Sequence, residues 1–279
     1  MAKKDLIREI ANEAPNRRRF MQKITTAGAA VTAAMTVGTR GLSAAAPSDA
    51  DILNFALNLE YLEAEFYTVA TTGQTIEQLG VPVTGTGTQG ATTGGMKVNF
   101  SNSLVFTGDV SNEIAFDERA HVVFIRTALQ SMGVTPIAKP AINLNALGVG
   151  FNSQMDFLQL ARAFEDVGVT AYAGAAPLIQ DKNILGAAAR ILAAEAEHVG
   201  NVRLQVTRLR VATAALDGVD ILPPPSGSKF FSLDNNALAQ VRTPGQVLYI
   251  VYGFKANASS GGFFPNGVNG PINMSSGSA

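Results

Sequence analysis

Both histidines of the chain stand in the same short motif. His121 follows Glu118 by three residues, and His198 follows Glu195 by three residues. On an α-helix, positions three apart lie on one face, so each motif directs a carboxylate and an imidazole toward the same neighbour. This combination of ligands suits iron or manganese, and zinc also accepts it. The two motifs therefore predict two halves of a metal site, each supplied by one helix.

A lone glutamate on an apolar stretch of helical period precedes each motif. Glu60 comes before the first motif and Glu165 before the second, and each is followed seven residues later by a tyrosine, Tyr67 or Tyr172. Seven residues are two helical turns, so each tyrosine shares a face with its glutamate, where it either packs or hydrogen-bonds a ligand. The order Glu, Glu-x-x-His therefore occurs twice. A dinuclear metal centre inside a four-helix bundle uses this pattern of residues.

Glu63 is an alternative to Glu60 as the ligand on the first helix. It lies one turn further along the same segment and faces in a similar direction. The internal repeat favours Glu60, because the second half of the chain has Gly168 at the position equivalent to Glu63. Glu65 points toward another face, and we expect it to be solvated.

The order of these motifs resembles that of the ferritin-like superfamily. In particular, the chain is similar to bacterial exported ferritin-like domain proteins, which also resemble plant desiccation-related proteins. The similarity covers roughly residues 48–216. A single Glu-x-x-His motif is weak evidence for such a family, whereas the complete alternating order is much more specific.

The resemblance implies a metal centre and a choice between two functional classes. Its cofactors would be two iron ions, or alternatively manganese, bridged by two glutamates and completed at each end by one glutamate and one histidine. It implies redox chemistry with oxygen or peroxide, of a ferroxidase or a peroxidase/catalase type. The alternative is a non-catalytic metal-binding or desiccation-protective bundle. The implied bridging residues are Glu118 and Glu195, and the end ligands are Glu60 with His121 and Glu165 with His198.

The spacing of apolar residues and of capping residues predicts an all-α fold. We expect a ferritin-like four-helix bundle with a long crossover between the second and third helices, a long loop insertion and a C-terminal extension. Ser48 and Asp51 form a capping-box pattern at the start of the first helix, and Gly133 is a stop signal for the second. The expected helices span about 48–71, 109–133, 153–177 and 183–216, and the loop insertion spans 73–108.

Three regions follow from composition and local motifs. Residues 1–45 resemble a twin-arginine signal peptide, with Asn-Arg-Arg-Arg-Phe-Met at 16–21 and then an apolar run that is shorter than the ~20 residues of a membrane span. We therefore expect the twin-arginine machinery as a partner, and a periplasmic or extracellular location. Residues 46–222 form the bundle, and 223–279 begin with a Pro-rich linker and continue as the C-terminal extension.

Composition excludes several other classes of function. The chain of 279 residues has no cysteine, so it has neither disulfides, nor thiolate metal sites, nor a cysteine nucleophile. Its formal net charge of −1 shows no excess of basic residues of the kind that is typical of nucleic-acid-binding proteins. Metal ions and oxygen or peroxide are the partners that the motifs indicate. The sequence is compatible with a homo-oligomer and with a monomer.

Overall fold

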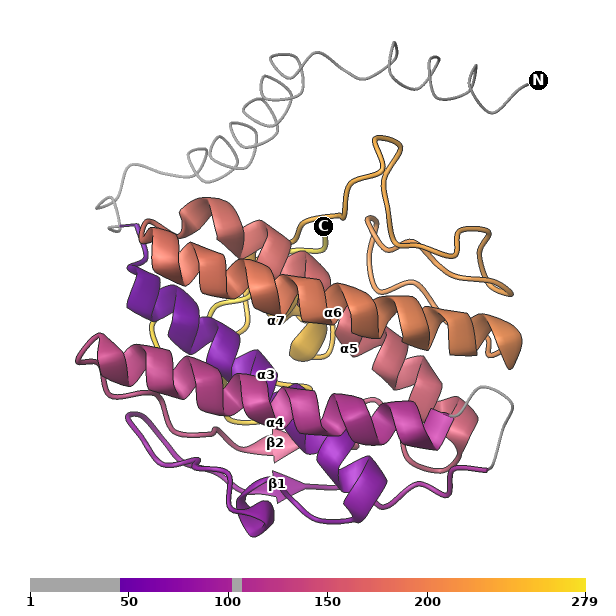
Figure 1. Cartoon of the computed structure of the whole chain (residues 1–279), viewed down its shortest axis with the longest axis horizontal. Helices are drawn as coiled ribbons and strands as arrows, with labels where there is room; N and C mark the ends of the chain where they lie inside the picture. The colour runs from indigo at the N-terminus through magenta and orange to yellow at the C-terminus, as the bar shows by residue number, and fades with distance from the viewer. Residues whose placement is uncertain (1–45, 102–106) are drawn as a thin grey trace, which may run out of the picture. The chain divides into compact units, whose positions relative to one another are not determined.

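Four long helices carry the predicted ligand positions. They are α3 (Asp49–Thr72), α4 (Thr107–Ser131), α5 (Gln154–Ala175) and α6 (Lys182–Arg208). The computed structural model describes residues 46–101 and 107–279. In Figure 1, α3 lies alongside α4 and α5 lies alongside α6, and the long connection from α4 to α5 joins the two pairs. The predicted all-α bundle with a crossover between its second and third helices is therefore confirmed.

Local capping interactions set where these helices begin. Ser48 and Asp51 form a reciprocal capping box at the start of α3, as predicted, and the Ser153 side chain accepts a hydrogen bond from the backbone of Asp156 at the start of α5. Asp181 caps α6 through the backbone N–H groups of Asn183 and Ile184. Each cap satisfies N–H groups that have no partner within the helix.

The end of α6 differs from the prediction, because the helix stops at Arg208 and not near Leu216. Arg210 adopts a left-handed conformation with φ of 55°, and Val211 N–H donates to the carbonyl of Val206 over 2.9 Å. Arg210 N–H donates to the carbonyl of Thr207, which completes a Schellman-type end. Such ends usually have glycine at the left-handed position, so arginine there gave no stop signal in the sequence.

The loop insertion and the α4–α5 crossover run side by side over α3. Strands β1 (Thr92–Thr93) and β2 (Ile142–Asn143) pair in parallel between them. Beneath the loop, Lys139 is fully buried and donates to Glu65 over 2.5 Å, and its ammonium lies 3.1 Å from Glu77. The expectation that Glu65 is solvated was wrong, because the insertion covers that face of α3 with Ile76 and Thr92, and Lys139 of the crossover supplies a cation for the carboxylate.

The C-terminal extension packs into the same core as the bundle. It contains the short helix α7 (Pro244–Val251), which is followed by buried Tyr252, Phe263 and Phe264. Residues Pro47–Ala279 form one compact unit. The described helices include no segment that is both long and apolar enough to cross a membrane. The predicted signal peptide, 1–45, lies outside the described residues.

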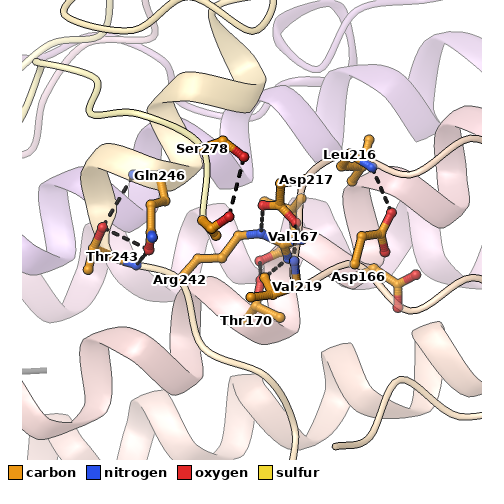
Figure 2. Close-up of polar contacts among 12 residues, drawn as sticks. Asp166, Val167, Thr170, Leu216, Asp217, Val219, Arg242, Thr243, Gln246 and Ser278 are labelled. Carbon is orange, nitrogen blue, oxygen red and sulfur yellow. Dashed lines mark hydrogen bonds and ion pairs between the residues drawn. The ribbon is translucent and has the colours of Figure 1, made fainter. Parts of the chain in front are cut away.

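Buried arginines attach the extension to α5. Arg242 donates to both carboxylate oxygens of Asp217 and to the Thr170 hydroxyl, each over 2.7 Å. Figure 2 shows these three residues and the contacts between them. The carbonyl of Arg242 lies so close to Gly174 that a Cβ there would come within 2.1 Å of it. Glycine in this last part of α5 therefore permits the backbone contact between helix and extension.

Candidate metal centre

The structure brings all six predicted side chains to one place in the interior of the bundle. They form two groups of four residues, and in each group one donor atom from every residue lies within 4.8 Å of the others. Two glutamates, one from α4 and one from α6, belong to both groups. The first group is Glu60, Glu118, His121 and Glu195, and the second is Glu118, Glu165, Glu195 and His198.

In the first group, the imidazole of His121 faces three carboxylates. Its Nδ1 lies 3.3 Å from Glu60 Oε2, 3.5 Å from Glu195 Oε1 and 3.6 Å from Glu118 Oε2. The four glutamates of the centre have side chains that are at most 1% exposed, and the His121 side chain is 12% exposed. One nitrogen and three oxygens thus converge on a point shielded from solvent.

The second group repeats this arrangement around His198, with one addition. Nδ1 of His198 lies 3.2 Å from Glu118 Oε1 and 3.4 Å from Glu165 Oε2, and its Nε2 lies 3.2 Å from Asp117 Oδ2. Sequence analysis missed Asp117, although it directly precedes Glu118. A carboxylate on the outer nitrogen fixes the orientation of a ligating imidazole. The corresponding residue of the second motif is Ala194, which offers no side-chain acceptor.

The inner atoms of the centre face one another without forming hydrogen bonds. In the described part of the chain, the buried atoms without a hydrogen-bond partner include both oxygens of Glu118 and of Glu195, and Nδ1 of both histidines. Burying several such groups is costly unless a cation satisfies them. Their types and convergence therefore fit metal ions bound by carboxylate and imidazole.

The two predicted tyrosines reach across the centre to the opposite half-site. Tyr67 on α3 donates to Glu165 Oε1 on α5 over 2.5 Å, and Tyr172 on α5 donates to Glu60 Oε1 on α3. Each hydroxyl holds the outer oxygen of a lone glutamate and leaves the other oxygen, Oε2, directed at the centre. The helical spacing correctly predicted that each tyrosine lies on the same helix face as its glutamate. It did not indicate that each tyrosine would bind the glutamate of the other half-site.

Comparison with known proteins places this geometry in a family. Residues 48–208, more than half of the chain, match the family model of the ferritin-like domain. The chain belongs to this ferritin-like family. The match includes all four ligand-bearing helices and ends where α6 ends.

Two named relatives share parts of the ferritin-like chain. It is 24% identical to the ferritin-like catalase Nec2 of Nesocodon mauritianus, over 85% of this chain and 88% of Nec2. It is 27% identical to the desiccation-related protein PCC13-62 of Craterostigma plantagineum, over 53% of this chain and 50% of that protein. The first similarity extends beyond the bundle into the flanking regions, whereas the second spans about half of each protein.

Burial and the mixture of acids and bases shift the pKa values at this ferritin-like centre. Burial alone would raise the pKa of Glu118, but the adjacent His121 and His198 outweigh it and lower the pKa to about 2. Burial alone would lower the pKa of His198, but Glu118 and Glu165 raise it to about 12. The pKa of His121 is raised in the same way. Burial, and then the charge of Glu118, raises the pKa of Glu195 well above its usual range.

These shifts predict that metal binding releases protons. Both histidines carry a proton in the metal-free protein at neutral pH, and an imidazole must lose the proton on its ligating nitrogen to bind a metal ion. Adding ferrous or manganous ion in weak buffer should therefore release about two or more protons per chain, measured with a pH indicator. The affinity for metal should fall as the pH falls. His198→Ala should release fewer protons, and uptake of metal without acidification would contradict this prediction.

Glu63 is buried beside the centre but belongs to neither group of converging donors. Glu60, by contrast, belongs to the first group, and its choice over Glu63 as the ligand stays a prediction. A Cβ at Gly168 would lie 2.4 Å from Glu195 Oε2 and 3.2 Å from Glu63 Oε1, so the missing side chain leaves room for both carboxylates. Burial, followed by the charge of Glu195, raises the pKa of Glu63 well above normal.

Proposed function

We propose that this ferritin-like protein holds two transition-metal ions between its four helices and uses them to disproportionate hydrogen peroxide. The observation behind the proposal is the set of buried inner oxygens and nitrogens that have no hydrogen-bond partner among the described residues. Six side chains contribute them from four different helices, so folding of the bundle positions the site in advance of metal binding.

The two overlapping groups suggest how the ions would be held. Glu118 and Glu195 would each contact both ions, since they belong to both groups. Glu60 with His121 would complete one position, and Glu165 with His198 the other. Two neutral imidazoles and four carboxylates balance the charge of two divalent ions. Iron and manganese suit this mixture of ligands.

When bound, the two ions would supply two-electron redox chemistry, by which one peroxide is oxidised to oxygen and a second, taking up the two protons that the first releases, is reduced to two waters. The chain's own part is orientation and exclusion of solvent. Tyr67 and Tyr172 fix the carboxylates of the lone glutamates, and Asp117 fixes the ring of His198. The glutamates are shielded from water, which strengthens their attraction for cations.

Similarity supports this reaction over the others that such a centre could perform. The relative aligned over 85% of this chain is named a ferritin-like catalase. The second candidate function is a non-catalytic metal-binding or stress-protective role, which the partial similarity to a desiccation-related protein favours. The two candidates differ in whether the bound metal reacts repeatedly.

Turnover with hydrogen peroxide distinguishes these two functions. Protein loaded with iron or with manganese should consume many equivalents of peroxide and evolve one oxygen molecule for every two peroxides, as followed with an oxygen electrode. The metal-free protein and loaded Glu197→Ala, which changes an exposed glutamate on α6, serve as negative and positive controls. A single stoichiometric reaction with tightly held metal would favour the protective role and contradict the catalase proposal.

A further inference from the structure

A cavity opens next to one end of the candidate metal centre, where α4 and α6 face each other. Its volume is about 330 Å³. Of the six predicted ligands, His121 is the one that lines it. The other lining residues are Ala120 and Phe124 from α4 and Ala187, Arg190 and Ile191 from α6. The small side chains of the two alanines leave the space between the helices open.

A second cavity adjoins the first one between the helices. It has a volume of about 170 Å³ and shares Phe124, Ala187 and Ile191 with the first. Its lining includes Tyr172, whose hydroxyl donates to Glu60. His121 and Glu60 both belong to the first group of donors. The two adjoining cavities therefore approach this group from two sides.

The opposite end of the centre has a different surrounding. There the outer nitrogen of His198 contacts the carboxylate of Asp117. In the sequence repeat, the residue equivalent to Asp117 is Ala194, so His121 has no such carboxylate from that position. The charges also differ between the two repeats. Arg190 on α6 lies five residues before Glu195, whereas the equivalent position on α4, five residues before Glu118, is Glu113. A guanidinium at the mouth attracts anions, while Asp117 at the other end repels them.

We propose that the α4–α6 cavity is the entry path for the small oxidant, and that it leads to the metal position of Glu60, Glu118, His121 and Glu195. This inference rests on the proposed function. The ligand class is a small polar molecule that binds as an anion, such as a peroxide. At the position beside His198, the carboxylate of Asp117 disfavours the approach of an anion. The two halves of the repeated site would thus differ in function, since only the half with His121 would bind the oxidant.

Azide binding tests this inference with a readout other than activity. Azide is a small anion whose binding to the oxidised, metal-loaded protein is followed by absorption in a stopped-flow instrument. Ala187→Leu places three more carbon atoms in the cavity and should slow azide association by about tenfold or more, with the metal content unchanged. Ala189→Leu, on an exposed position of the same helix, is the matched control and should leave the rate as it is.

Two further variants serve as an independent way to fill the cavity, in case Ala187→Leu does not fold, and as a test of the charge at its mouth. Ala120→Leu fills the same cavity from α4 and should also slow association. Arg190→Glu should lower the association rate by about tenfold at low salt, with a smaller effect as ionic strength rises. Equal azide rates in the wild type and both leucine variants, or no azide binding to a protein with two ions, would overturn the entry path. Failure to retain two ions would instead reject the proposed function.

Discussion

Replacing Glu118 or Glu195 with alanine should empty both metal positions. Each glutamate contributes oxygens to both groups of donors, so its loss removes one ligand from each ion and one shared negative charge. Loaded anaerobically and desalted, the wild type should retain about two ions per chain, and either variant less than one. His121→Ala or His198→Ala should reduce the affinity of one position more than that of the other. The measurement is metal analysis by mass spectrometry.

The control for this experiment is another glutamate of α6. Glu197 is exposed, two residues from Glu195, so Glu197→Ala should keep full metal content. Glu63→Gln should also retain two ions, since Glu63 lies outside both groups. Circular dichroism should show unchanged helix content for every variant. A folded Glu118→Ala protein that keeps two tightly bound ions would show that the shared carboxylates do not hold the metals.

Much of the candidate site could be predicted because helical periodicity limits which residues share a face. The three-residue spacing in Glu118-x-x-His121 and its repeat placed both motifs toward the interior, where the structure finds them. Periodicity does not reveal which neighbour a side chain meets. The tyrosines therefore pair with the opposite half-site, and Asp117 becomes a partner of His198 on another helix.

Other features depend on contacts between distant segments, which a local pattern does not encode. Glu65 is buried because the insertion covers it and the α4–α5 crossover brings Lys139, 74 residues later in the chain, to its carboxylate. The extension has the composition of an irregular tail, rich in Gly, Ser and Asn, yet it supplies Phe263 and Phe264 to the core. Its attachment relies on buried ion pairs whose partners are far apart in sequence.

Arg242→Met should lower the free energy of unfolding by about 3–5 kcal/mol, because it breaks a buried ion pair from one side. Both Arg242 and Asp217 are almost fully buried, with side chains 1% exposed. Methionine fills part of the volume but leaves the Asp217 carboxylate without its cation and the Thr170 hydroxyl without its donor. Urea unfolding followed by circular dichroism measures the change, with Arg208→Met on the exposed end of α6 as the control.

A second substitution, at Asp217, separates two effects of Arg242→Met on stability: the unpaired buried charge and the loss of packing. In Arg242→Met combined with Asp217→Leu, no unpaired carboxylate is buried, so much of the lost stability should return. Because the extension shares the core of the bundle, a single unfolding transition should persist in both variants, at a lower urea concentration in the single variant. A change below about 1 kcal/mol in Arg242→Met would mean that the arginine is not needed to hold the extension. A separate early transition would mean that the extension unfolds independently of the four helices around the metal centre.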